Sequence, residues 1–253
     1  MQNEPMADHV GISSPPTFHE IALKYGTDKV ASHHYWFMYD KYLPSFREQK
    51  IKMLEIGLGC DMVSSAAILP PVAGKMLIQR PPTQNYGPGK SYYTWLEYFP
   101  FVDLYYMEYD AACAQKWASK TTGATIVPGD QSDAAFLEKF LADAGTDFDI
   151  IIDDGGHTMT QQKVSLQHLW RAIKPGGIYF VEDLETSYLP SYGGDDAPAE
   201  GWKGENTMVR YIYELIDDKM RGGKVHEAIT ANLRSIDCDR QICALIKKDE
   251  GTV

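Results

Sequence analysis

The chain has 253 residues, of which 44% are hydrophobic and 23% charged, a balance that excludes disordered, collagen-like and coiled-coil proteins. It carries 35 acidic and 24 basic residues, which gives a formal charge of −11. Proteins that bind nucleic acids or anionic membranes usually have an excess of basic residues, so this charge argues against both classes. No apolar run reaches about 18 residues, the length that indicates a transmembrane helix. The first segment, MQNEPMADHV, lacks the basic and apolar regions of a signal peptide, so we expect none.

The chain begins with a polar, proline-containing stretch, residues 1–15, which we expect to be a flexible tail. Two regions of short helix are predicted over 16–25 and 35–48, with the polar segment GTDKVASHH between them. From residue 51 onward, apolar runs of strand length alternate with helical patterns. In chain order these predict a strand at 51–56, a helix at 92–99, a strand at 102–109, a helix at 111–120, a strand at 124–127, a helix at 133–145, a strand at 148–153, a helix at 161–173, a strand at 178–183, a helix at 206–220 and late strands at 225–233 and 240–248.

The alternation of strands and helices predicts an α/β fold. Several strands are continuous apolar runs, such as 148–153, and these are typical of parallel strands that are covered by helices on both faces. The expected architecture is therefore a doubly wound, mostly parallel sheet. Because ligands bind such sheets at the carboxyl ends of the strands, the residues that follow each strand are the candidates for chemistry.

The four cysteines are Cys60, Cys113, Cys238 and Cys243, and they form no CxxC pair. Cysteines this sparse are typical of reduced, packed thiols, whereas zinc sites and disulfide frameworks use clustered cysteines. We therefore expect reduced thiols and a cytoplasmic protein.

A glycine-rich turn follows the first strand, in the order Glu55-Ile-Gly57-Leu-Gly59. Glycines at this place allow a tight turn and a close approach of the backbone to a ligand. The pattern fits a site for NAD, FAD or S-adenosylmethionine, and it also fits a turn without a ligand.

Acidic residues follow the second and third strands. Glu108 lies where an acid binds ribose hydroxyls in dinucleotide-binding and related folds, and Asp110 is the rival candidate. Either residue could instead be a solvated carboxylate at a helix start. After the third strand, Asp130 could face a ligand, whereas Asp133 is expected to cap the next helix.

Two adjacent acids, Asp153 and Asp154, end the fourth strand, and Gly-Gly-His157 follows them. Adjacent carboxylates that face a cleft are costly unless a cation, a proton or hydrogen-bond donors compensate them. A hard cation such as Mg²⁺ takes carboxylate oxygens, and His157 has an ordinary pKa close to neutrality, which suits a general base. The alternative is a helix cap with an exposed histidine.

The fifth strand ends in a second acidic group. Asp183 is expected beside Asp154 at the next strand end, where the two carboxylates would make a plausible Mg²⁺ site. Glu182 and Glu185 are equally compatible with solvated loop charges.

Together these motifs resemble the class I S-adenosylmethionine-dependent methyltransferases, and more closely the metal-dependent macrolide-sugar O-methyltransferases of the mycinamicin and tylosin type, with their cephalosporin-pathway relatives. The resemblance covers residues 25–188, and FDIIIDDGGH with EDLETSY is its most specific part. The resembling stretches are YGTDK at 25–29, HHY at 33–35, MLEIGLG at 53–59, YGPGKS at 86–91, FP at 99–100, GDQSD at 129–133, FDIIIDDGGH at 148–157, KPGG at 174–177 and EDLETSY at 182–188.

The resemblance implies a Rossmann-like, doubly wound, mostly parallel seven-stranded sheet with helices on both faces and a short N-terminal helical segment. It implies that this segment, residues 16–50, is a lid and that 51–253 is the methyltransferase domain. It implies S-adenosylmethionine as cofactor, bound by strand-end residues: Glu55, Gly57, Gly59, Glu108, Asp130 and Asp153. It further implies Mg²⁺ at Asp154 and Asp183, with Asp154 and His157 as catalytic residues and His157 as the base.

The implied function is O-methylation of a small-molecule hydroxyl in secondary metabolism, and the family suggests a homo-oligomer. The metal would lower the pKa of the acceptor hydroxyl, and the oxygen would attack the sulfonium methyl in line. One alternative is a non-catalytic cofactor-binding or partner protein. A nicotinamide oxidoreductase is disfavoured because Gly57-Leu-Gly59 continues as Cys60-Asp61 and does not complete GxGxxG.

One segment departs from the family pattern. Residues 63–84 separate GLGCDM from the YGPG stretch that follows it almost directly in the family. A long loop without structure of its own is itself unusual in a compact domain. Two hypotheses stay open for these residues: a retained intron in a predicted gene, and a real insertion that forms a lid.

Overall fold

The computed structural model describes residues 14–60, 89–195 and 205–251. The insertion at 63–84 and nearly all of the expected tail lie outside these residues. Within the described part, no helix is long and apolar enough to cross a membrane.

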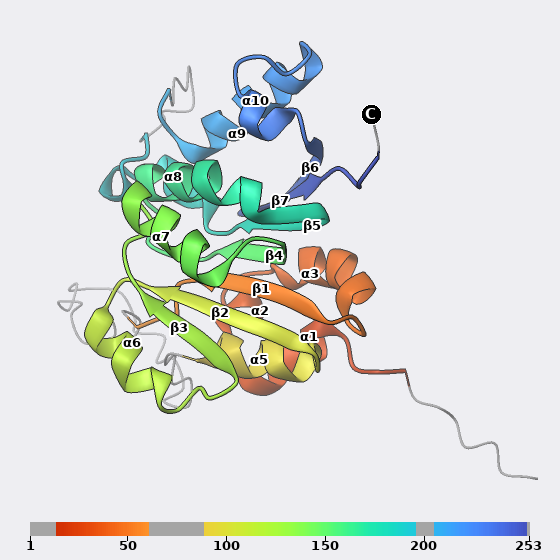
Figure 1. The fold of residues 1–253 in the computed structure, drawn as a ribbon, viewed down its shortest axis with the longest axis vertical. Coiled ribbons are helices and arrows are strands. Elements are labelled where there is room, and N and C mark those ends of the chain that lie inside the picture. Colours follow the sequence, from red (N-terminus) through yellow and green to blue (C-terminus); the bar gives the residue numbers. More distant parts are fainter. Residues whose placement is uncertain (1–13, 61–88, 196–204, 252–253) are drawn as a thin grey trace, which may run out of the picture.

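A seven-stranded sheet forms the centre of the protein, with the strand order β3-β2-β1-β4-β5-β7-β6 (Figure 1). The first five strands are parallel, whereas β7 pairs antiparallel with both β5 and β6. This topology confirms the predicted doubly wound, mostly parallel sheet. The strands are β1 (Ile51–Ile56), β2 (Val102–Glu108), β3 (Ala124–Pro128), β4 (Phe148–Asp153), β5 (Ile173–Val181), β6 (Leu233–Asp239) and β7 (Ile242–Lys247).

Helices cover both faces of the sheet, and each face has its own hydrophobic core (Figure 1). Side chains of β4 alternate between the cores: Ile150 and Ile152 pack with the N-terminal helices, and Ile151 packs on the opposite face. The continuous apolar run therefore has the cause that was predicted, burial on both faces. The α-helices are α1 (Phe18–Tyr25), α2 (Asp28–Ala31), α3 (Trp36–Tyr42), α5 (Lys90–Tyr98), α6 (Ala111–Ala118), α7 (Ala134–Ala144), α8 (Met159–Leu169), α9 (Met208–Met220) and α10 (Glu227–Thr230).

The N-terminal segment packs against the sheet as three short helices. Thr17 and Glu20 form a capping box that starts α1, and Gly26, at φ 68°, ends it. The following polar segment, predicted as a connection, contains the one-turn helix α2. This turn brings Lys29 into the protein interior, where its side chain is 1% exposed.

One late element differs from the prediction. The segment 225–233 was predicted as a strand, but it forms α10, and β6 begins only at Leu233. The reason lies in α9, where the buried Asp218 carboxylate accepts backbone N–H bonds from Lys224, Val225 and His226. These bonds fold the chain into a turn, so its apolar residues cannot continue as an extended strand. The last predicted strand, 240–248, is confirmed as β7.

The expectation of reduced thiols is wrong, because all four cysteines form disulfides: Cys60–Cys113 and Cys238–Cys243. The second bridge joins directly paired residues of the β6–β7 hairpin. The first joins residues 53 apart in sequence, which meet because they follow the adjacent parallel strands β1 and β2. The inference of a cytoplasmic location from reduced thiols loses its basis.

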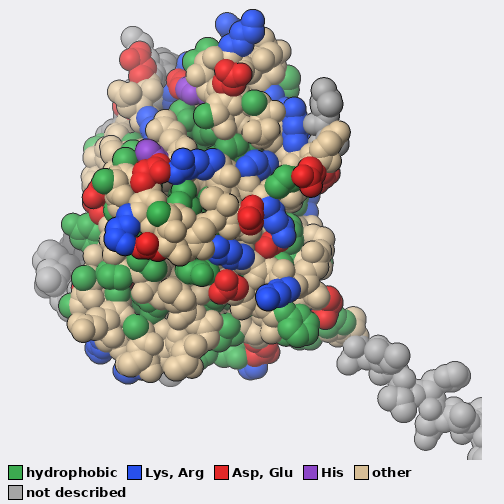
Figure 2. All heavy atoms as spheres, viewed as in Figure 1, with side chains coloured by type: hydrophobic (Ala, Val, Ile, Leu, Met, Phe, Trp, Pro, Cys, Tyr) green, Lys and Arg blue, Asp and Glu red, His purple; other side chains and the backbone are tan. Residues whose placement is uncertain are grey.

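Acidic and basic side chains are intermixed on the face of the protein that Figure 2 shows, and no extended basic patch is visible there. This distribution agrees with a composition in which acidic residues outnumber basic ones.

Candidate active site

A cavity of about 750 Å³ lies at the carboxyl ends of the parallel strands, where the topology predicts a ligand site. Its volume is in the range of small-molecule and cofactor pockets. Residues of the β1, β2, β3 and β4 ends line it together with residues from α2 and from the segment before α9: Asp28, Ser32, His33, Ile56, Gly57, Gly59, Cys60, Met107, Glu108, Tyr109, Gly129, Gln131, Asp154, Gly155, Gly156, His157, Gln161 and Tyr192.

The turn after β1 requires glycine at position 57. Gly57 has φ +94°, and a Cβ built there would lie 2.0 Å from the carbonyl oxygen of Asp154. The backbone is held in place by bonds from Gly57 N to Met107 O and from Asp154 N to Ile56 O. The glycine pattern thus has a physical role, because it lets the ends of β1 and β4 come together at the cavity.

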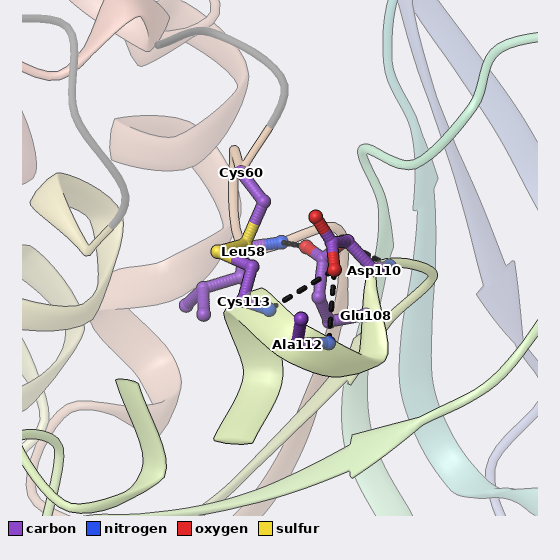
Figure 3. Close-up of a disulfide and its surroundings, with 6 residues drawn as sticks. All are labelled: Leu58, Cys60, Glu108, Asp110, Ala112 and Cys113. Carbon is purple, nitrogen blue, oxygen red and sulfur yellow. Dashed lines mark hydrogen bonds between the residues drawn. A yellow bond between two sulfur atoms is a disulfide. The ribbon is translucent and has the colours of Figure 1, made fainter. Parts of the chain in front are cut away.

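Glu108 lies beside this turn and is 6% exposed. One carboxylate oxygen accepts the Leu58 N–H at 2.9 Å, and the other accepts the Asp110 N–H at 2.8 Å (Figure 3). Asp110, the rival candidate, caps α6 by accepting from the N–H groups of Ala112 and Cys113. Of the two acids, only Glu108 lines the cavity, which makes it the stronger candidate for ribose hydroxyls.

The Cys60–Cys113 disulfide lies beside Glu108 at the wall of the cavity. It links the turn after β1 to the first turn of α6, and these two segments flank the Glu108 carboxylate (Figure 3). A covalent link at this place restrains two walls of the predicted cofactor site relative to each other. The pairing was not foreseen because the two cysteines are far apart in sequence.

The two acids at the end of β4 have different surroundings. Asp153 is fully buried, and its carboxylate accepts bonds from Gln131 Nε2, Ser165 Oγ and Tyr179 OH at 2.5–3.1 Å. Burial raises the pKa of Asp153, and the donors Ser165 and Gln131 oppose the rise. Asp154 points to the cavity, and burial likewise raises the pKa of its carboxyl group, against the attraction of Lys29.

His157 lines the cavity, and Asp183 lies directly behind it. His157 Nε2 lies 3.1 Å from Asp183 Oδ2, and the Tyr35 hydroxyl donates to Asp183 Oδ1 at 2.5 Å. Both His157 and Asp183 have positive φ angles, 58° and 53°. Such angles are uncommon for residues other than glycine and occur often at functional sites. His157 Nδ1 is buried and has no hydrogen-bond partner among the described residues.

Lys29 lies below the cavity with its ammonium among carboxylates. Its Nζ is 2.6 Å from Asp154 Oδ2, 2.6 Å from Glu182 Oε2 and 3.2 Å from Glu55 Oε1. Burial alone would lower the pKa of Lys29, but the carboxylates of Asp154 and Glu182 outweigh it, and the pKa lies well above its usual value. Glu182 is therefore a buried member of an ion cluster and not a solvated loop charge.

The structure brings together some of the predicted site residues and separates others. Asp183 joins the site through His157, although it does not line the cavity. The predicted cofactor contacts Glu55, Asp130 and Asp153 do not line it either. The Asp130 carboxylate accepts bonds from Ser132 within its own loop. The predicted residues that line the cavity are Gly57, Gly59, Glu108, Asp154 and His157.

No protein-family model matches the chain. Among characterised proteins, it is 31% identical over 207 residues to the demethylmacrocin O-methyltransferase of Streptomyces fradiae, which covers 81% of this chain and 45% of that protein. It is also 31% identical over 208 residues to the mycinamicin VI 2''-O-methyltransferase of Micromonospora griseorubida, covering 81% and 44% of the two chains. The chain thus spans less than half the length of these relatives.

A solved structure agrees with the sequence relatives. The MycE methyltransferase from the mycinamycin biosynthetic pathway, in complex with Mg and S-adenosylhomocysteine, superposes with a TM-score of 0.72 and 26% identity. The match covers 95% of this chain and 58% of that one. The chain is a homologue of the macrolide-sugar O-methyltransferases and belongs to the class I methyltransferases. The resemblance seen in the sequence is confirmed.

The donor atoms beside the cavity fit the metal that the family implies. Asp154, His157 and Asp183 each offer a ligand atom, and these atoms lie within 4.8 Å of one another. Two of the three are carboxylates, the hard oxygen ligands that Mg²⁺ prefers.

Several residues of the candidate site could not be predicted from the sequence. Lys29 ends the YGTDK stretch, and nothing in this polar segment indicates a buried charge. Gln131 joins two strand ends by donating to Asp153 and accepting the Gly156 N–H, and Tyr35 bonds to Asp183. A polar residue directly after a parallel strand was the available signal for Gln131.

Proposed function

We propose that the protein is an S-adenosylmethionine-dependent, Mg²⁺-assisted O-methyltransferase that acts on a sugar hydroxyl of a small molecule. The observation that carries this proposal is the position of the glycine turn and Glu108 in one cavity with Asp154 and His157. A class I cofactor site and a carboxylate–histidine group then face the same space. The related O-methyltransferases support the same activity and give no support to a non-catalytic protein.

In the proposed reaction, the glycine turn and Glu108 bind the cofactor, with the Glu108 carboxylate toward the ribose hydroxyls. Asp154 and Asp183 would hold Mg²⁺, which when bound would lower the pKa of the acceptor hydroxyl. His157 would take the hydroxyl proton as the base, and its Nε2, which lies 3.1 Å from Asp183 Oδ2, would donate from the resulting imidazolium to that carboxylate. The walls of the cavity would align the acceptor oxygen with the sulfonium methyl.

The acceptor class is inferred from the relatives. Their names describe transfer to hydroxyls of macrolides and of rhamnosyl tetracenomycin, including a 2'- and a 3'-position. A glycosylated polyketide is therefore the proposed acceptor of this chain. A homo-oligomer stays a proposal, and so does a cytoplasmic location, which now rests on the biosynthetic relatives and no longer on reduced thiols.

The direct test is transfer of radiolabelled methyl from S-adenosylmethionine to sugar-bearing polyketides and to an extract of host metabolites. We expect labelled product with Mg²⁺ and at least a roughly 10²-fold loss in excess chelator, the lower scale for losing a charge-stabilising group. Full activity in the chelator would contradict the metal assignment. No transfer to any acceptor, despite tight S-adenosylhomocysteine binding, would favour a non-catalytic protein.

A second form of the protein that lacks residues 63–84 belongs in the same assay. If these residues are a retained intron, their deletion should improve cofactor binding and soluble yield. A loss of affinity on deletion would instead indicate a working insertion.

A further inference from the structure

A single buried ammonium connects three strand ends below the cavity. The carboxylates around Lys29 come from β1, from the end of β4 and from the end of β5: Glu55, Asp154 and Glu182. The side chains of Lys29, Glu55 and Glu182 are each 1% exposed, so water screens these charges little. Lysine is almost never buried so completely unless it is paired.

The two carboxylate oxygens of Glu55 have different surroundings, because Oε2 accepts hydrogen bonds whereas Oε1 only faces the Lys29 ammonium. Oε2 accepts bonds from Ser91 Oγ and Trp95 Nε1, both at 2.8 Å, and Oε1 lies 3.2 Å from Lys29 Nζ. Glu55 does not line the cavity, so its carboxylate does not face a ligand bound there. Glu55 is connected to the cavity through Lys29 and Asp154.

Lys29 also determines where α2 lies. Asp28, Ser32 and His33, which flank Lys29 in or directly after α2, form part of the cavity wall. A helix of one turn has little stability of its own, so its position depends on tertiary contacts such as the Lys29 ion cluster. The same ammonium therefore fixes one wall of the cavity and pairs with one oxygen of Asp154.

We propose that Lys29 is a positioning residue of the methyl-transfer site and that Glu55 acts by holding Lys29, not by contacting the cofactor. This inference rests on the proposed function, since it assigns the cavity to the cofactor and Asp154 to the reaction. Without the ammonium, the three carboxylates would repel one another in a space that excludes water. The α2 wall would then lose its position, and the Asp154 carboxylate would keep its place but lose the ammonium that neutralises its charge.

A double-mutant cycle tests the proposal with Lys29→Met, Glu55→Gln and the two combined. Methionine keeps the length of the lysine stem without the charge, and glutamine keeps the shape of Glu55. The matched control is Lys24→Met, because Lys24 is a 58% exposed lysine of α1 that pairs with Glu97. Three quantities are measured on the full chain: S-adenosylhomocysteine affinity by calorimetry, Mn²⁺ binding by electron paramagnetic resonance, and the melting temperature without ligands.

We expect Lys29→Met to weaken S-adenosylhomocysteine binding by about tenfold or more, a conservative scale for breaking a buried ion pair. Mn²⁺ should bind at least as tightly as in the wild type, because the cluster has lost one positive charge. A purely structural collapse would weaken the binding of both ligands.

Glu55→Gln should change S-adenosylhomocysteine affinity by less than about threefold. The double variant should bind S-adenosylhomocysteine as weakly as Lys29→Met does, and its melting temperature should be equal to or higher than that of Lys29→Met.

Three results would overturn the proposal. One is a Lys29→Met protein that behaves like the Lys24→Met control in all three measurements. Another is a tenfold loss of S-adenosylhomocysteine affinity in Glu55→Gln that multiplies with the Lys29→Met effect, which would mean that Glu55 contacts the cofactor. The third is a double variant that melts below Lys29→Met. If the wild type binds neither ligand, the proposed function fails, and the melting temperatures alone still decide whether Lys29 and Glu55 are coupled.

Discussion

The neighbouring residues Asp153 and Asp154 show two ways to hold a carboxylate inside one protein. Asp153 lies in a pocket of neutral donors: Gln131, Ser165 and Tyr179. Asp154 lies in the ion cluster of Lys29, which also includes two glutamates. Asp153 is the last residue of β4 and is buried, whereas Asp154 is the first residue after the strand and lines the cavity.

The difference indicates a division of labour between the two surroundings. Neutral donors satisfy a single carboxylate and tie Asp153 to α8 and to Gln131, which suits a structural role. One ammonium among three carboxylates leaves a net negative charge, which can bind a metal ion or stabilise a positively charged reacting group. Substitutions in the two regions should therefore affect different properties.

The largest effect is expected for Asp154→Asn. Turnover should fall at least about 10²-fold, the lower scale for losing one catalytic charge, while S-adenosylhomocysteine affinity stays nearly unchanged. His157→Ala should lose a similar factor, and the double variant should cost much less than the product of the two. Steady-state kinetics beside calorimetry measures both properties. Equal losses of cofactor affinity and turnover would contradict the separation of cofactor and reaction groups.

Asp153→Asn should act on stability instead. The asparagine amide would turn a donor toward the donors of Gln131, Ser165 or Tyr179, so we expect the free energy of unfolding to fall by about 1–3 kcal/mol. Denaturant unfolding of Asp153→Asn and Asp154→Asn measures the contrast. Ser165→Ala, which removes only one donor, is the matched control and should cost less. A more stable Asp153→Asn protein would remove the basis for the comparison.

The two disulfides should also differ in their effect on the cavity, although the expected change is smaller. Cys113→Ser removes the covalent link between the turn after β1 and α6. Because cofactor binding must then order both segments at a cost in free energy, the affinity for S-adenosylhomocysteine should fall roughly 3- to 10-fold. Cys238→Ser breaks the bridge of the β6–β7 hairpin, which contributes no residue to the cavity lining, and should leave the affinity unchanged. Titrations of S-adenosylhomocysteine into both variants provide the measurement. Equal losses would mean that the first bridge has no local role.

The sequence predicted the parts of this protein that follow from local pattern. The apolar run 148–153 and the glycine at position 57 each reflect one physical requirement, burial on two faces and a close approach of two strand ends. The parts that depend on contacts across the fold were missed. Lys29 pairs with residues up to 153 positions away, and Asp218 turns a strand-like segment into a helix and a turn.

The central claim is that the strand-end cavity is a site for S-adenosylmethionine beside the Asp154–His157–Asp183 group. Calorimetric titration of S-adenosylhomocysteine into the wild type and Glu108→Ala, with NAD as the comparison ligand, tests it most directly. We predict binding of S-adenosylhomocysteine to the wild type, a loss of about tenfold or more in Glu108→Ala, the scale of one or more hydrogen bonds to a charged group, and no binding of NAD. Binding of NAD, or S-adenosylhomocysteine affinity that is unchanged in Glu108→Ala, would contradict the claim.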